Sequence, residues 1–226
     1  MATYSAKGGK EFAKVSAGTH MAVCTLVADV GLQPGSPKFP DPKVRIFLRF
    51  EIPSDRITYE KDGVEHEGPA VIYHNWNASM NPKATMRKHI ESWRGSKFTD
   101  ADAEQFDVRK LLGQTCLVQV VHTEDGQYAN VANIMAPPKG TPKVKAEGTL
   151  VYYGPDDDAQ YDVLPAFLRK KVDEQLGEAP TSTKGGHVSS TSTRTTGPTD
   201  SEADAIAAQQ AAKAAGGDDF NDEIPF

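Results

Sequence analysis

The sequence contains little cysteine and no long apolar run. Its 226 residues include two cysteines, Cys24 and Cys116, and neither lies in a Cys-x-x-Cys pair or beside a histidine at metal-ligand spacing. Both fall in strand-like apolar runs, so we expect buried free thiols rather than a disulfide or a zinc site. No run approaches the roughly 20 apolar residues that span a bilayer, and the first residues lack the apolar stretch of a signal peptide. We therefore expect a cytoplasmic protein with no membrane partner.

The chain also lacks the residue clusters that usually carry catalysis. It has no phosphate-cradling glycine loop and no constellation of His, Cys and Asp. The acidic residues of the segment 100–107 lie two or three positions apart, and on a helix positions two apart face different directions. We predict that the protein is not an enzyme and has no cofactor and no metal site. A nuclease remains the disfavoured alternative.

Charge is distributed unevenly along the chain. Residues 1–150 contain 19 lysines and arginines against 17 acidic residues, a net charge of +2. Residues 151–226 contain 6 against 14, a net charge of −8. This distribution of charge suits a protein whose body binds an anion and whose tail is repelled by that anion.

The first half of the chain predicts long strands. Residues 19–30 are apolar on both alternating faces, which indicates a central strand. The segment 31–43 holds four prolines and two glycines and is expected to be a loop. Residues 43–52 then alternate with period two, and their apolar face is Val44, Ile46, Leu48, Phe50 and Ile52.

The opposite face of the 43–52 strand alternates cations with an aromatic ring. Its members are Arg45, Phe47, Arg49 and Glu51. A guanidinium group can meet a phosphate while a ring stacks on a base, so this face suits a single-stranded nucleic acid. The competing interpretation is an ordinary solvated strand face with one exposed phenylalanine.

Turn and cap residues divide the middle of the chain. Asp62-Gly63 and Asp125-Gly126 predict two hairpins, which pair residues 57–59 with 68–76 and residues 114–122 with 127–135. Asn81 as N-cap and Pro82 as first helical residue predict a helix that runs to Arg94 before Gly95. Thr99, with Asp102 three residues later, predicts the cap of a short acidic helix.

The last predicted elements of the body are a short strand over 149–153 and a helix over 159–176, interrupted at Pro165. Strands in this order, with a helix between the third and the fourth, match a mainly β fold. We predict an OB-like Greek-key barrel of five to six strands with inserted and C-terminal helices, followed by a disordered acidic tail. In such a barrel the second and third strands and the neighbouring loops bind oligonucleotides.

The predicted fold puts the candidate contacts to single-stranded DNA on the second and third strands and the elements beside them. The residues that we expect to follow the backbone or stack on bases are Lys38, Phe39, Lys43, Arg45, Phe47, Arg49, Tyr59, Tyr73, Trp76, Arg87 and Lys88. Because base stacking and phosphate contacts tolerate any sequence, we expect binding without sequence specificity and with steep salt dependence.

The last nine residues combine carboxylates with an apolar terminus. The members expected to bind a partner are Asp218, Asp219, Phe220, Asp222, Glu223, Ile224, Pro225 and Phe226. The competing interpretation is an ordinary frayed acidic end. Residues 177–217 are rich in Thr, Ser, Gly and Ala, so we expect a flexible linker between this tip and the body. One hypothesis is that the tip occupies the basic surface when DNA is absent.

Two stretches resemble known families. The acidic tip with its terminal Ile-Pro-Phe resembles that of bacterial single-stranded DNA-binding proteins, which recruits replication and repair partners. Residues 91–140, with Trp93-Arg94-Gly95, Phe106-Asp107 and Tyr128-Ala129-Asn130, resemble a block in single-stranded DNA-binding proteins encoded by tailed bacteriophages. The resemblance implies an OB-like core and DNA binding during phage replication, recombination or repair in the host cytoplasm.

The sequence thus predicts three parts: a DNA-binding domain over residues 1–176, a linker over 177–217 and a protein-interaction tip over 218–226. The implied partners are single-stranded DNA and replication or recombination proteins. The alternative is an OB-fold adaptor that binds proteins and no nucleic acid. The oligomeric state stays open, with a homo-oligomer among the alternatives.

Overall fold

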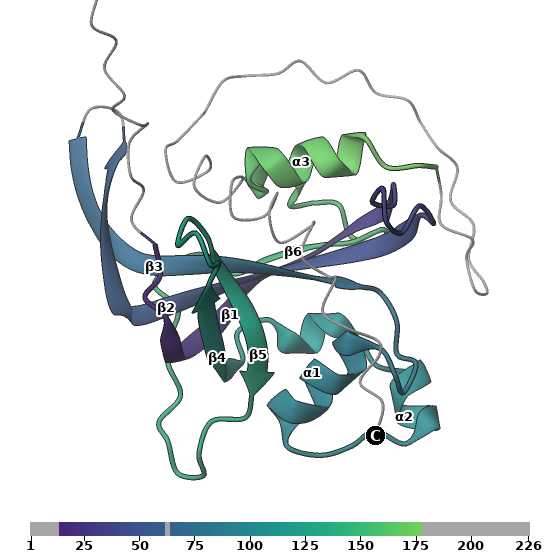
Figure 1. The fold of residues 1–226 in the computed structure, drawn as a ribbon, viewed down its shortest axis with the longest axis horizontal. Coiled ribbons are helices and arrows are strands. Elements are labelled where there is room, and N and C mark those ends of the chain that lie inside the picture. The colour runs from purple at the N-terminus through teal and green to yellow at the C-terminus, as the bar shows by residue number, and fades with distance from the viewer. Residues whose placement is uncertain (1–13, 62–63, 178–226) are drawn as a thin grey trace, which may run out of the picture.

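The structure, a computed structural model, describes residues 14–61 and 64–177. This part of the chain is mainly β. Its elements, shown in Figure 1, are β1 (Gly18–Gln33), β2 (Lys43–Lys61), β3 (Val64–Asn77), α1 (Thr85–Arg94), α2 (Asp100–Glu104), the 3-10 turn η1 (Val108–Leu111), β4 (Thr115–His122), β5 (Ala129–Met135), β6 (Val151–Tyr153), the 3-10 turn η2 (Tyr161–Val163) and α3 (Ala166–Asp173).

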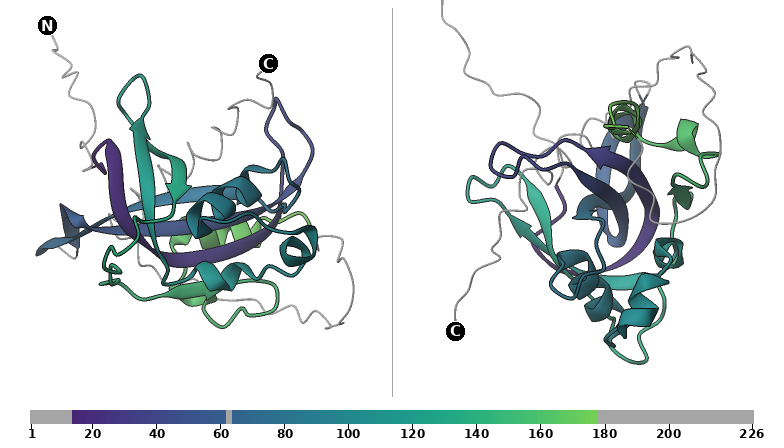
Figure 2. Two further views of the ribbon diagram at one scale, coloured as in Figure 1. Left: turned by 90° about the horizontal axis from the view of Figure 1, so that it is seen from below. Right: turned by 90° about the vertical axis from the view of Figure 1, so that its right-hand side faces the viewer.

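The strands form one six-stranded open sheet in the order β3-β2-β1-β4-β5, with β6 beside β1. All pairings are antiparallel except that of β6 with β1. The central strand β1 pairs with β4 through Gly18–Val23 and with β2 through Val23–Gln33. Its ladder with β2 is interrupted at two irregularities, and the sheet is strongly curved (Figure 2). Both faces of β1 are apolar because Ala22, Cys24 and Val27 belong to one hydrophobic core and Leu26, Ala28 and Val30 to another.

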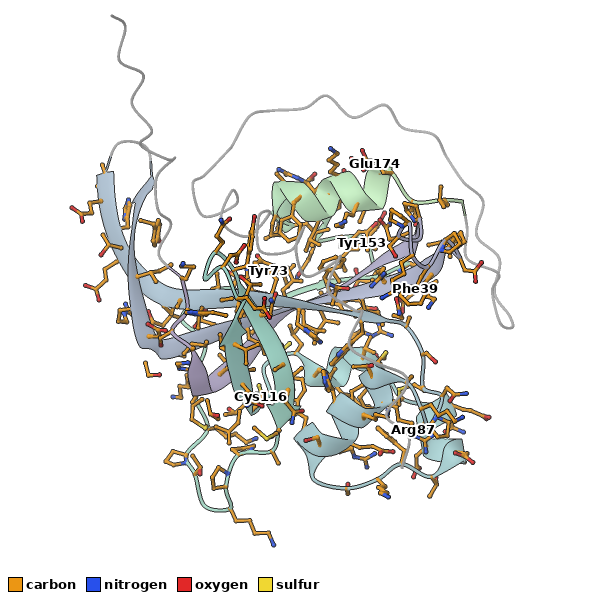
Figure 3. All side chains as sticks on the ribbon, viewed as in Figure 1. Phe39, Tyr73, Arg87, Cys116, Tyr153 and Glu174 are labelled. Atoms are coloured by element: carbon orange, nitrogen blue, oxygen red, sulfur yellow. The ribbon has the colours of Figure 1, made fainter. Side chains whose placement is uncertain are left out.

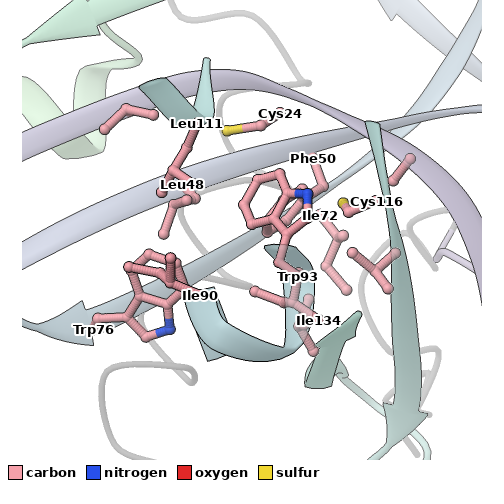
Figure 4. Packing of buried hydrophobic residues seen from close by; sticks show 14 of the residues in the cluster. Cys24, Leu48, Phe50, Ile72, Trp76, Ile90, Trp93, Leu111, Cys116 and Ile134 are labelled. Atoms are coloured by element: carbon pink, nitrogen blue, oxygen red, sulfur yellow. The ribbon is translucent and has the colours of Figure 1, made fainter. Parts of the chain in front are cut away.

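The main core lies between the concave side of the sheet and α1, which contacts β3 and β5. The apolar face predicted for residues 43–52 is confirmed for Ile46, Leu48, Phe50 and Ile52, which belong to this core, whereas Val44 at its start is only partly buried. Figure 4 shows the rings of Trp93 and Phe50 packed beside the two cysteines. Both thiols are free and buried, as expected, and burial raises the pKa of Cys24 to about 12.

A second core lies on the other face of the sheet, under α3, and includes Val151 of β6 (Figure 1). Leu164, Leu168 and Val172 of the C-terminal segment pack there against Leu26 and Phe47. The buried carboxylate of Glu51 accepts hydrogen bonds from the backbone N–H groups of residues 147 and 148, which fixes the approach to β6. The sheet is therefore covered on both faces along β1 and β2.

Short-range cap predictions were correct at two helix ends and wrong at one. Gly95 ends α1 with φ of +68°, and Thr99 Oγ1 accepts the N–H of Asp102 at the start of α2. However, α1 begins at Thr85, not after Asn81. Asn81 Oδ1 instead accepts the N–H of Lys83 within a separate tight turn. The side chain that was expected to cap the helix is thus engaged by the turn that precedes it.

No helix within residues 14–61 and 64–177 is both long and apolar enough to cross a membrane. The predictions of a linker over 177–217 and of an acidic tip over 218–226 lie outside the described residues, Gly177 excepted.

Candidate nucleic-acid interface

The β1–β2 loop carries the most exposed of the predicted stacking rings. Phe39 is 49% exposed, and the Lys38 ammonium lies 5.6 Å from the centroid of its ring. The backbone N–H of Phe39 donates to Ser36 Oγ, and a Cβ on Gly35 would lie 2.2 Å from the Phe39 carbonyl oxygen. The loop therefore folds back on itself at Gly35 and presents a ring and a cation together.

Three further cations lie where this loop joins the body. Lys43 is exposed and pairs with Gln33 across the loop, and Arg45 follows two residues later on the outer face of β2. Lys171 of α3 joins them, because its carbonyl oxygen accepts a hydrogen bond from Gln33 Nε2 at 2.9 Å. We call this set the loop-end patch; its members are Lys38, Phe39, Lys43, Arg45 and Lys171.

Figure 3 shows that Phe39 and the end of α3, marked by Glu174, lie at the same end of the molecule. A hydrogen bond from the Leu176 N–H to the Leu32 carbonyl oxygen, 2.8 Å long, joins the two segments. The loop-end patch therefore combines residues more than 100 positions apart in the chain.

The prediction of an exposed stacking ring is wrong for Phe47 and for Tyr73. Phe47 is 2% exposed, and its ring meets the edge of Phe167 from α3 at 6.2 Å between centroids. Tyr73 is also buried, with the same Phe167 ring 5.1 Å away. The face of β2 was assigned correctly, but α3 covers it. These two rings stabilise the second core and cannot stack on a base in this conformation.

Trp76 is also buried rather than exposed. Its indole Nε1 donates to His89 Nδ1 at 3.0 Å, and the His74 ring lies edge-on to it at 5.8 Å between centroids. Burial lowers the pKa of His89 to about 4, and burial together with the charge of His89 lowers the pKa of His74 to about 3. Trp76 thus belongs to the main core and packs against two partly buried histidines at its margin.

Two of the predicted backbone contacts, Arg87 and Arg49, have partners within the fold. Arg87 is buried and holds the start of α2, because it pairs with Glu91 and Asp100 and donates to the carbonyl oxygens of Met80 and Phe98. The Arg87 guanidinium, predicted to contact DNA, is therefore already bound by groups of the protein. The neighbouring Lys88 is exposed.

Arg49 is similarly engaged by the fold. Its Nε donates to Thr25 Oγ1 at 2.9 Å, and its Nη2 donates to the Thr149 carbonyl oxygen at 3.1 Å. The side chain therefore connects β2 to β1 and to the segment that leads into β6.

Tyr59 lies apart from the loop-end patch, on the hairpin formed by the outer parts of β2 and β3. Its ring stacks on His66 at 5.7 Å and 22°, above Gly68. The structure thus brings Lys38, Phe39, Lys43 and Arg45 together and leaves Tyr59 and Lys88 on other surfaces. The candidate partner-binding residues 218–226 lie outside the described residues.

Sequence reasoning missed Lys171. The pair Lys170-Lys171 looks like part of an ordinary solvated helix, and only the position of α3 over β2 brings the second lysine to the loop. No local pattern identifies it.

Within the part of the chain that the structure describes, no group of three or more His, Cys, Asp or Glu side chains is placed to hold a metal ion. Comparison with known proteins adds no assignment: no protein family, no curated protein and no solved structure matches this chain.

Proposed function

We propose that this protein binds single-stranded DNA without sequence specificity through the loop-end patch. The observation that carries the proposal is the exposed Phe39 ring beside the Lys38 ammonium, on a loop that Gly35 folds tightly. A ring of this kind stacks on any base, and the surrounding cations can contact phosphates. In this account Phe39, one of the rings predicted from the sequence, stacks on the bases, whereas Phe47, Tyr73 and Trp76 are buried.

We further propose that the body is an OB-type barrel. The sheet order β3-β2-β1-β4-β5, the sharing of β1 between β2 and β4, and the position of α1 between β3 and β4 support this assignment. In barrels of this type the loop between the first two strands flanks the oligonucleotide. Lys38 and Phe39 of the loop-end patch lie in the corresponding loop of this chain, between β1 and β2.

The acidic tip, residues 218–226, would then recruit replication, recombination or repair proteins. With the resemblance to phage proteins over residues 91–140, this favours a role in phage DNA metabolism in the host cytoplasm. A weakly basic body and an acidic end suit this division, since the tip is repelled by the DNA that the body holds.

The direct test is the anisotropy of a labelled oligo(dT) titrated with wild-type protein and with the Phe39→Ala variant. Loss of one stacked base costs about 1–3 kcal/mol, so the Kd should rise about 5- to 150-fold. The matched control is Val121→Ala, which truncates an exposed apolar side chain on β4. Equal Kd values for Phe39→Ala and wild type would refute the role of the loop, and no binding by wild type would leave the protein-binding adaptor as the function.

A further inference from the structure

Lys171 is the one member of the loop-end patch that lies on α3. Its amine is half-buried and lies 5.6 Å from the centroid of the Phe47 ring. Burial lowers the pKa of Lys171, and the positive charge of Arg45 lowers it further. Arg45 of β2 and Lys171 of α3 therefore interact electrostatically, beside the apolar ring of Phe47.

Hydrogen bonds restrict the guanidinium of Arg45 and the backbone of Lys171. Arg45 Nη1 donates to the side-chain oxygen of the buried Asn75 at 3.0 Å. Gln33 Nε2 donates to the carbonyl oxygens of both Val30 and Lys171, at 2.8 and 2.9 Å, and so fixes the end of α3 to the end of β1. The fold itself, rather than the chance rotation of exposed side chains, brings the two cations together.

The charges around Lys171 favour an anion. Arg45 and Lys170 lower its pKa, and Glu174 raises it. The Glu174 carboxylate is shared, because it lies 3.8 Å from the ammonium of Lys170. An anion between Arg45 and Lys171 would relieve their repulsion. A guanidinium together with an ammonium group is well suited to a phosphate, since both donate charge-assisted hydrogen bonds to its oxygens.

We propose that Arg45 and Lys171 together bind one phosphodiester group of the DNA strand whose bases stack on Phe39. The inference rests on the proposed function and adds a specific backbone contact to it. Helix α3 then has two roles: it closes the second core over Phe47, and it supplies a phosphate ligand from a part of the chain far from the OB-type loop.

The test compares oligo(dT) binding by wild type, Lys171→Met and Lys171→Arg over a series of salt concentrations. Methionine keeps an unbranched apolar stem over Phe47 and removes the charge. One lost phosphate contact should weaken binding about tenfold at low salt and reduce the slope of log Kd against log salt by about 0.7. Lys171→Arg should restore both. The control, Lys139→Met, removes an exposed charge from the β5–β6 loop, on the far side of the sheet from α3 (Figure 1), and should change neither.

A second measurement uses the wild-type chain, so it does not depend on the folding of any variant. Acetylation of Lys171 by a water-soluble reagent, followed by mass spectrometry, should slow several-fold when oligo(dT) is added, while acetylation of Lys139 stays unchanged. Inorganic phosphate at the same phosphate concentration should not protect Lys171. Protection by inorganic phosphate alone would overturn the assignment to DNA and indicate a free-anion site.

The outcomes separate this inference from the proposed function. If wild type binds oligo(dT) but Lys171→Met keeps the affinity and the salt slope, and DNA leaves Lys171 acetylation unchanged, the inference is wrong and the function stands. If wild type does not bind oligo(dT), the proposed function itself fails.

Discussion

Acidification should destabilise this protein through two partly buried histidines that pack beside Trp76 of the main core. His74 of β3 and His89 of α1 lie 5.3 Å apart between ring centroids. The Trp76 indole donates to His89 Nδ1, so that nitrogen must carry a lone pair. His74 Nε2 is buried and has no hydrogen-bond partner among the described residues. A proton on either ring therefore places a charge in a poorly solvated site, and on His89 Nδ1 it also breaks a hydrogen bond.

The direction of the pH effect follows from the pKa values. In the unfolded chain a histidine has a pKa of about 6.5, whereas in the folded protein the pKa of His74 is about 3 and that of His89 about 4. The unfolded state therefore binds more protons than the folded state below pH 6.5. The stability is fully present above that pH and is lost as the pH falls toward the folded pKa values. At pH 5 the loss from His74 alone is on the order of 2 kcal/mol.

Urea unfolding followed by tryptophan fluorescence at pH 8 and at pH 5 measures this loss. The His74→Leu variant should lose about 2 kcal/mol less than wild type between the two pH values, because it removes one of the titrating groups. His66→Gln, which removes an exposed ring on the β2–β3 hairpin, is the control and should behave as wild type. If His74→Leu and wild type lost equal stability, the buried histidines would not be the cause of acid sensitivity.

Three further predictions concern Phe47, Arg87 and the acidic tip, residues 218–226. Phe47→Ala should cost about 3–5 kcal/mol of unfolding free energy, while oligo(dT) affinity of the folded protein stays within twofold of wild type; a large loss of affinity at full folding would restore Phe47 as a DNA contact. Arg87→Met should lower the thermal midpoint clearly more than Lys88→Met, since Arg87 holds the start of α2; equal midpoints would argue against that role. Deletion of residues 218–226 should tighten oligo(dT) binding at low salt, and unchanged affinity would argue against competition by the acidic tip.

The sequence predicted those parts of the fold that depend on neighbouring residues. The alternation over residues 43–52 identified the core face of β2, and the Gly95 and Thr99 caps marked ends of α1 and α2. Asn81 shows the limit of this reasoning. Its side chain can cap a helix or close a turn, and only the course of the chain toward α1 decides between them.

The candidate site was harder to predict, because long-range packing decides which side chains face solvent. The outer face of β2 has the composition of an exposed binding face, but a helix about 120 residues later covers Phe47. The same helix brings Lys171 to the β1–β2 loop. Arg87 likewise resembled one charge of a solvated helix face until its four partners were known. A single sequence shows the alternation and the charges, but it does not show which element packs against them.

The central claim is that unpaired DNA stacks on the β1–β2 loop, and a Phe39→Trp variant tests it most directly. Both native tryptophans are buried in the main core, so an indole at position 39 adds an exposed reporter. Titration with oligo(dT) should quench the added fluorescence to saturation, and rising salt should reverse the quench. If wild type and Phe39→Trp gave the same small response to oligo(dT) in dilute buffer, DNA would not stack on this loop and the account would be wrong.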